Sequence, residues 1–271
     1  CDLLYNVTTD ETVSIISSSI KSDIEPNAYQ KELVERVVDA LGCDNARKSI
    51  VSPRLIATAP LHPLTAIILG PLAKRSFSQN ERSTFGFLNS NEPASFNLFL
   101  KSTTDVNARY SLAHLWDYLD ANLQFVITNS RDGRGWMMAS DIIQRIERLV
   151  GSNGITADSI RLVKTIAIIN LFGRAALVFA NESVLSAAMQ CSYQELTDMI
   201  GLLSALSVVT YRKHQNSWEI FEGSDININE LLSKMLSQVD SDSKVIESLD
   251  YSEYVMAKGH YHESGTIRWV K

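Results

Sequence analysis

Between residues 155 and 221 the spacing of apolar residues changes from that of helices to that of paired strands. Stretches with helical spacing come first, at 155–171, 183–189 and 193–206. Residues 208–221 then alternate between two faces with a period of two, and a four-residue turn interrupts them. Three helices followed by a β-hairpin is the element order of a winged helix-turn-helix. The sequence therefore predicts this module in the second half of the chain.

The third of these helices carries an N-terminal signal. Ser192 and Glu195 have the spacing of a capping box, in which each side chain accepts a hydrogen bond from the other residue's backbone N–H. We therefore expect the helix to begin directly after Ser192.

The first half of the chain reads as a bundle of shorter helices. Apolar residues recur at helical spacing in several stretches: 12–22, 26–41, 64–73, 91–100 and 110–122. Ser78 and Glu81 form a second capping-box spacing, which predicts a helix over 82–88. Residues 129–136 are predicted as a loop, and Ser140 is expected to cap the helix that follows.

Gly151 to Gly154 is the best candidate for a domain boundary. The predicted organisation is a helical domain at 1–151, a winged-helix domain at 152–240, and a further segment or tail at 241–271. The fold class is mainly α, with a small β-hairpin.

Composition limits the function classes. The net charge of −6 argues against a general binder of nucleic acid or anionic membranes, although it leaves room for a local basic patch. The cysteines Cys1, Cys43 and Cys191 are odd in number and far apart, which favours the reducing cytoplasm. No apolar run is long enough to span a bilayer, so no membrane partner is expected. The chain begins with Cys-Asp-Leu-Leu, which we interpret as a fragment of a larger protein.

The winged helix raises the question of DNA binding, and its charges weigh against base reading. The helix at 193–206 contains Glu195 and Asp198 but no Lys or Arg, whereas the wing contains Arg212 and Lys213. A groove reader normally needs several cations to neutralise phosphates. Three alternatives stay open: base-specific DNA binding, weak DNA contact through Arg212 and Lys213, and a packing or protein-interaction role, as a scaffold without nucleotide or in contact with an effector.

The densest polar pattern of the chain lies between residues 62 and 83. One interpretation is structural, with Ser78 and Glu81 capping a helix and His62 ending a loop. The other is functional: Arg75 or Arg82 would contact a nucleotide phosphate, as arginines do where phosphoryl charge develops.

Other candidate motifs are weak. His260 and His262 would share a face if they lay on a strand, but only Glu263 accompanies them, so a surface pair is favoured over a metal site. Gly133-Arg134-Gly135 is too short for a phosphate loop. The sequence Gly-x-x-x-x-Gly-Lys-Ser/Thr is absent, as are the nucleophile and zinc motifs of common hydrolases. The residues do not indicate a self-contained active site.

Two groups of segments together resemble a known family. The first is Leu61-His62-Pro63-Leu64-Thr65 followed by Gln79-Asn80-Glu81-Arg82-Ser83-Thr84-Phe85-Gly86-Phe87-Leu88. The second is Leu162 to Ile166, the wing, Glu222 to Asn227, and the tail from Ala257 to Arg268. From about residue 60 to the end, the chain resembles large bacterial and archaeal P-loop ATPases. These are AAA+-like or STAND-like proteins, often found in mobile-element or phage-defence loci.

The resemblance implies a role for each segment. The Walker motifs would lie upstream of Cys1, in an ATPase core that binds ATP with Mg²⁺. The helical segment would form a lid over the nucleotide, and the winged helix would relay the nucleotide state to an effector or nucleic acid. Arg82 or Arg75 would contact the phosphate, with His62, Gln79, Asn80 and Glu81 in support. The chain departs from the family because it lacks the phosphate-binding loop, so we expect no cofactor and no catalysis by this chain alone. Lys258-Gly259-His260 is also less basic than the family's pattern.

Overall fold

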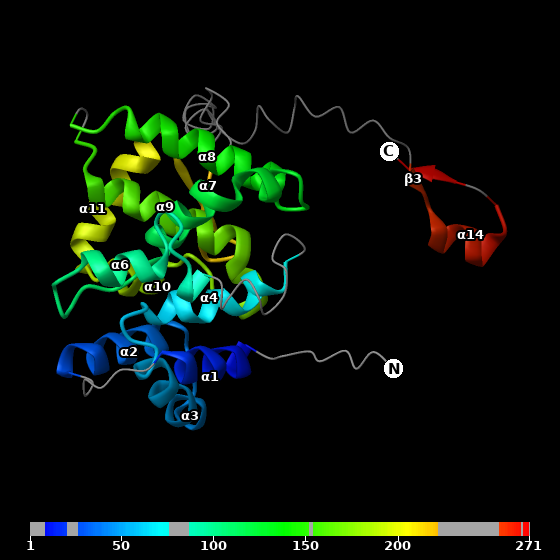
Figure 1. The fold of residues 1–271 in the computed structure, drawn as a ribbon. Helices are drawn as coiled ribbons and strands as arrows, with labels where there is room; N and C mark the ends of the chain where they lie inside the picture. The colour runs from blue at the N-terminus through cyan, green and yellow to red at the C-terminus, as the bar shows by residue number, and fades with distance from the viewer. Residues whose placement is uncertain are drawn as a thin grey trace. The chain divides into compact units, whose positions relative to one another are not determined.

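The structure is a computed structural model, and it describes residues 9–20, 27–75, 87–151, 154–221, 255–266 and 268–270. It divides into two compact units, Cys1–Gly223 and Ser224–Lys271. As predicted from the sequence, the chain is mainly helical and carries a small β-hairpin (Figure 1).

The first unit contains helices over most of its described length. These are α1 Thr9–Ser19, α2 Ala28–Ala40, α3 Asn45–Ile56, α4 Pro63–Ala73, α6 Phe96–Ser102, α7 Leu112–Thr128, α8 Gly133–Glu147, α9 Ala157–Phe172, the 3-10 turn η1 Gly173–Ala176, α10 Glu182–Met189 and α11 Tyr193–Ala205. Strands β1 Val209–Arg212 and β2 Ser217–Ile220 follow.

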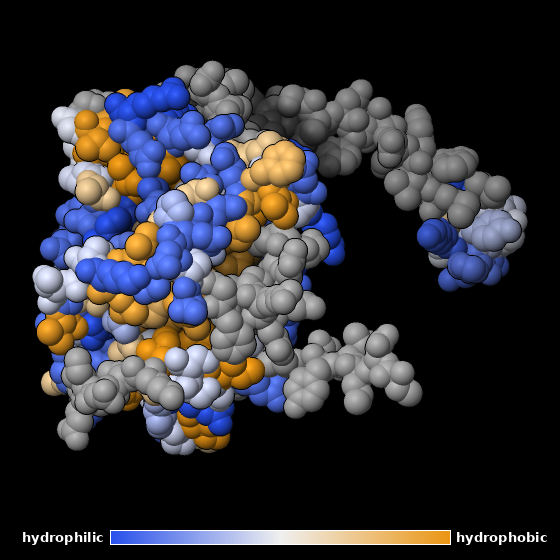
Figure 2. All heavy atoms as spheres, in the orientation of Figure 1, coloured by the Kyte–Doolittle hydropathy of each residue, from blue (hydrophilic) through white to orange (hydrophobic). Residues whose placement is uncertain are grey.

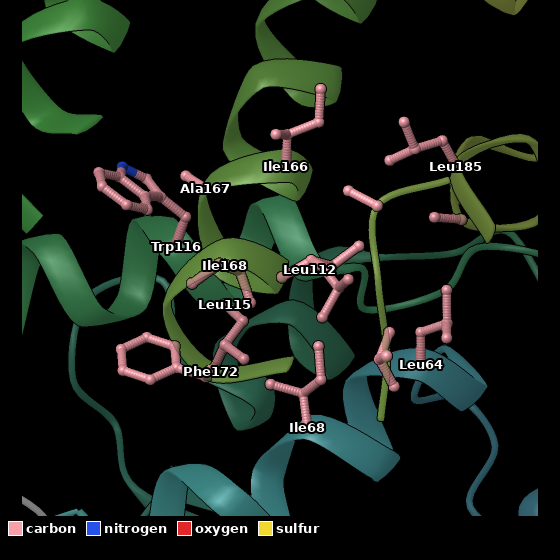
Figure 3. Close-up of a cluster of buried hydrophobic side chains, with 14 of the residues drawn as sticks. Leu64, Ile68, Leu112, Leu115, Trp116, Ile166, Ala167, Ile168, Phe172 and Leu185 are labelled. Atoms are coloured by element: carbon pink, nitrogen blue, oxygen red, sulfur yellow. The ribbon is translucent and has the colours of Figure 1, made fainter. Parts of the chain in front are cut away.

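Helix α9 lies at the centre of this unit. Its neighbours include α4, α7, α8 and α10 as well as strand β2. Figure 3 shows side chains of α9, among them Ile168 and Phe172, close to Leu115 of α7 and Ile68 of α4. A helix that buries residues on nearly every side must be apolar all round, and α9 has buried residues from Ser159 to Phe172 on successive turns.

Helices α9, α10 and α11 with the hairpin β1–β2 form the predicted winged-helix order. The strands pair antiparallel, with Val209 opposite Ile220. Asn170 of α9 anchors the hairpin, because its side-chain amide donates to the Trp218 carbonyl at 3.0 Å and its carbonyl oxygen accepts from the Ile220 N–H at 3.1 Å. The predicted capping box is confirmed: the Ser192 hydroxyl accepts from the Glu195 N–H at 3.3 Å, and the Glu195 carboxylate accepts from the Ser192 N–H at 2.8 Å.

The prediction for residues 129–136 was partly wrong. Helix α8 already begins at Gly133, and Ser140 lies buried inside it instead of capping it. The glycines that suggested a loop are required by packing. A Cβ on Gly133 would lie 2.0 Å from the Thr128 carbonyl oxygen, and one on Gly135 would lie 2.9 Å from Leu171 Cδ2. Glycine therefore allows the start of α8 to pack tightly against α7 and α9.

Two other differences concern the first half. Helix α3, which periodicity did not indicate, packs on α2 while burying little more than Leu55. Helix α6 begins at Phe96, where Ser95 caps it, and not at the expected 91–93. The predicted capping box at Ser78 and Glu81 lies outside the described residues.

The predicted boundary at residues 151–152 lies inside the first unit. Helices α8 and α9, on either side of it, pack together and share one hydrophobic core.

The second unit is described in its last part. Strand β3 Val255–Met256 pairs antiparallel with β4 Trp269–Val270, and α14 Lys258–Ser264 connects them. His260 and His262 would share a face only on a strand, and both lie on helix α14. Two residues apart on a helix, their side chains point in different directions.

Candidate functional site

Arg75, one of the two candidate phosphate-contacting arginines, follows α4 and joins three helices. Its guanidinium donates to the Leu171 carbonyl of α9 at 2.9 Å and lies 3.4 Å from the carboxylate of Asp132, which precedes α8. It also lies over the Phe172 ring, 5.7 Å from the centroid. These contacts show that Arg75 holds the C-terminal ends of α4 and α9 against the start of α8.

The other members of the predicted phosphate site fall outside the described residues. Arg82, Gln79, Asn80 and Glu81 all do so. Their contact with a nucleotide stays a prediction. Of the two arginines, Arg75 has its guanidinium engaged by protein groups.

His62 is a buried cap of α4. Its ring Nδ1 accepts from the Leu64 N–H at 3.2 Å, and Nε2 lies 3.3 Å from the Ala187 carbonyl of α10. The side chain is 1% exposed. The ring therefore serves α4 and α10 as a neutral imidazole with its proton on Nε2, and any support that it gives to a site is through the position of α4.

Burial lowers the pKa of His62 to about 4, although the hydrogen bond to Ala187 opposes this shift. A protonated ring would direct a second N–H at the Leu64 N–H, which has no acceptor to offer. The two hydrogen bonds of the His62 ring therefore suit its uncharged form.

The outward face of α11 occupies the position of a recognition helix. Its exposed residues include Tyr193, Gln194, Thr197 and Asp198, and Tyr193 is 59% exposed. The Gln194 amide donates to the Asp198 carboxylate at 3.0 Å. A face with these groups and without cations repels phosphates and suits hydrogen bonding and aromatic contact with a protein.

The wing places the two predicted DNA-contacting cations at the surface. Arg212 is exposed, and its guanidinium lies 3.0 Å from the Glu219 carboxylate on the facing strand. Lys213 is exposed at the turn, next to His214. The ion pair neutralises the charge of Arg212, so Lys213 supplies most of the positive charge with which the wing could attract a phosphate.

An ion cluster that the sequence did not indicate joins α7, α8 and α9. The Lys164 ammonium lies 2.8 Å from the Asp117 carboxylate and 3.0 Å from the Glu147 carboxylate. Nearby, burial raises the pKa of Asp120, and the negative charge of Asp117 adds to this shift. In the sequence, each of these charged residues falls on the polar side of its own helix, where periodicity predicts contact with water. The sequence therefore does not show that the three side chains pair with one another.

A cleft of about 420 Å³ lies between α2 and α3. Polar side chains of Glu35, Asp39, Lys48 and Ser52 line it, and Lys48 pairs with Asp39. In this cleft the Ser49 hydroxyl donates to the Ala46 carbonyl and not to a base, so the geometry does not indicate catalysis.

The described ranges contain no group of three or more potential metal ligands, His260 and His262 included. Within the same ranges, no helix is both long and apolar enough to cross a membrane. Comparisons of the chain with protein-family models, curated proteins and solved structures found no significant match.

Proposed function

We propose that this chain is a coupling module of a P-loop ATPase of the kind that its sequence resembles. Its helical part would lie over the nucleotide bound by an ATPase core of the same protein. Its winged helix would pass the nucleotide state to a protein effector. ATP and Mg²⁺ would be held by that core, and the chain would not turn over ATP alone.

The observation that supports this proposal is the position of α9. It is the first helix of the winged-helix module, and its side chains also complete the core of α4, α7 and α8 (Figure 3). Densely packed interiors transmit displacement because they resist compression. A shift of α4 would therefore move α9, and with it the hairpin that Asn170 anchors.

The acidic face of α11 supports a protein effector in preference to DNA. A DNA reader would present several cations there, whereas α11 presents Asp198 and Glu195 beside the aromatic ring of Tyr193. Tyrosine is enriched in protein interfaces because it combines a large apolar area with a hydroxyl group.

The first experiment measures ATP hydrolysis by the full-length protein with and without Arg82→Ala. Removing an arginine that stabilises phosphoryl charge is expected to slow turnover at least tenfold, a modest fraction of what such arginines contribute. Lys31→Ala is the matched control, because Lys31 is exposed on α2 and its replacement removes one positive charge from another part of the chain. Unchanged turnover in Arg82→Ala would remove that residue from the site, and no turnover in the native protein would remove the ATPase assignment.

A second measurement tests the relay. Amide hydrogen exchange over residues 192–206 is compared in the full-length protein with and without ATP. Coupling predicts a change in exchange at α11 that disappears in Arg82→Ala. Identical exchange in both nucleotide states would refute the relay and leave the winged helix as a static interaction module.

A DNA-binding regulator is the alternative function, and the exposure of Lys213 and His214 at the wing favours it. It requires duplex binding with a steep salt dependence that is lost in Arg212→Ala with Lys213→Ala. Binding that is absent or insensitive to salt would eliminate it.

A further inference from the structure

Three segments of the winged-helix region contact one another at an aromatic surface. Trp218 of β2 donates its backbone N–H to the carbonyl of Ala180 at 2.9 Å, two residues before Glu182 at the start of α10. Tyr211 lies opposite Trp218 in the hairpin, and the centroids of their rings are 5.1 Å apart. From the start of α11, the Tyr193 hydroxyl donates to the Glu182 carboxylate. We call Glu182, Tyr193, Tyr211 and Trp218 the aromatic face.

An electrostatic contact also connects α11 directly to the wing. The hydrogen bond to Glu182 and the charge of that carboxylate raise the pKa of Tyr193, and the ionised form of Tyr211 adds to the shift. Tyr193 and Tyr211 are therefore close in space. Tyr193 is 59% exposed and Tyr211 is 39% exposed, so a partner can reach both rings.

The side-chain donors of the aromatic face are already occupied or covered. The Tyr193 hydroxyl donates to Glu182, and the Tyr211 hydroxyl donates to the side chain of Asn216. The indole N–H of Trp218 is shielded from solvent. What remains for a partner is the electron-rich faces of the rings and a carboxylate, which keeps its negative charge because the hydroxyl bound to it is neutral. This combination attracts cations and repels phosphates.

The cations of the wing lie away from these rings. Side chains alternate between the two sides of a hairpin, so Arg212 and Glu219 project from the side opposite Tyr211, where they pair with each other. Lys213 lies in the turn, beyond the last paired residues of the strands. Helix α11 contains no Lys or Arg. The charge that borders the rings is therefore that of Glu182.

The surrounding surface does not favour a purely apolar partner. Figure 2 shows hydrophilic and hydrophobic residues interspersed on the side of the first unit where Figure 1 places α11. Without a large continuous apolar area, a partner that binds here must be selected by complementary charge and by specific ring contacts.

We propose that the aromatic face binds an arginine-bearing segment of the protein effector. The guanidinium would lie over the ring of Tyr193 or Tyr211 and donate to the Glu182 carboxylate. Arginine suits this face better than lysine, because its planar guanidinium stacks on a ring and still donates hydrogen bonds in its own plane. The proposal rests on the protein effector proposed above and adds the chemistry that this effector presents.

The test measures binding of labelled peptides to the whole chain by fluorescence anisotropy. The probe is a twelve-residue peptide of glycine, serine and four arginines, and its counterparts carry lysine, glutamine or proline at those four positions. We expect the arginine peptide to bind most tightly, the lysine peptide more weakly, and the glutamine peptide not measurably. The affinity should fall as salt rises, because salt screens the attraction to Glu182.

Substitutions assign the binding to the aromatic face. Tyr193→Ala should weaken binding of the arginine peptide about two- to thirtyfold, the range that cation–π contacts give from exposed to desolvated sites. Tyr193→Phe should keep most of the affinity, since it keeps the ring. Glu182→Gln should weaken binding about two- to fivefold and reduce its salt dependence.

Two exposed residues elsewhere provide matched controls. Tyr261→Ala removes an exposed tyrosine from the second unit, and Glu32→Gln removes an exposed carboxylate from α2. Both should leave binding unchanged. Thermal unfolding of every variant checks that the fold is retained.

Several results would overturn the proposal. Equal binding of the arginine and glutamine peptides would do so, as would equal losses in the face variants and the controls. Tightest binding of the proline peptide would replace the proposal with recognition of a polyproline segment.

The peptide test is independent of the tests of the proposed function. If no peptide binds but ATP still changes exchange at α11, the relay stands and the arginine chemistry is rejected. If the arginine peptide binds through Tyr193 and Glu182 but the full-length protein does not hydrolyse ATP, the ATPase assignment fails and the binding face stands.

Discussion

Acidification is expected to destabilise the fold through His62. The buried imidazole has a pKa of about 4 in the folded chain, against about 6.5 when it is unfolded. The folded-state pKa is depressed, so the unfolded chain takes up the proton first as the pH falls. The contribution of the neutral ring to stability is therefore complete above about pH 6.5 and is lost between there and pH 4.

The size of the effect follows from the two pKa values. Over the whole window it amounts to roughly 3 kcal/mol, at about 1.4 kcal/mol for each pKa unit, and about 2 kcal/mol of it falls between pH 7 and pH 5. The assay is urea denaturation of the native chain and of His62→Asn at several pH values. Asparagine keeps an acceptor at the N-cap of α4 but does not titrate.

We expect the stability difference between the two proteins to shrink by about 2 kcal/mol from pH 7 to pH 5. Burial also lowers the pKa of His114, but that residue titrates in both proteins, so the difference isolates His62. Parallel pH profiles of the native chain and the variant would refute the argument. They would mean that the ring titrates normally and that its two hydrogen bonds do not fix its protonation.

Three further predictions concern stability and are measured by chemical denaturation at neutral pH. Gly133→Ala should destabilise the chain by at least about 2 kcal/mol, because the new Cβ would collide with the Thr128 carbonyl. Gly201→Ala is the control: Gly201 has open space around it in α11, so this change should stabilise the chain by up to about 1 kcal/mol. Equal effects of the two changes would refute the close approach of α7 and α8. Trp136→Ala should cost about 3–5 kcal/mol, because the fully buried indole stacks on Trp116 with ring centroids 4.1 Å apart, and a cost under 1 kcal/mol would contradict that packing. Ser192→Ala should cost about 1 kcal/mol by removing the cap of α11, and a change within error would show that the cap is frayed in solution.

The features that the sequence predicted correctly are those with a local physical cause. The capping box at Ser192 and Glu195 needs only residues three apart, so its outcome did not depend on the rest of the fold. The period change at residue 208 likewise located the hairpin, because alternation follows from the geometry of one strand pair.

Local signals were misleading where tertiary contacts set the backbone. Gly133 and Gly135 predicted a loop, since glycine disfavours helices, yet both lie in α8. Glycine is needed at these two helical positions because Thr128 and Leu171 leave no room for a Cβ. Helix α3 escaped detection because its one buried residue, Leu55, gives no period to read.

The properties of the candidate site also fall into two groups, those set by the sequence and those set by the fold. The sequence by itself determined which residue types could contact a phosphate, and it showed that the recognition helix carries no cations. Only the tertiary structure decided that Arg75 is bonded to Leu171 and Asp132, and that His62 is buried with its pKa lowered. The reason is physical: charge and hydrogen-bonding capacity belong to a residue, whereas its partners and its exposure to water are set by segments far away in the chain.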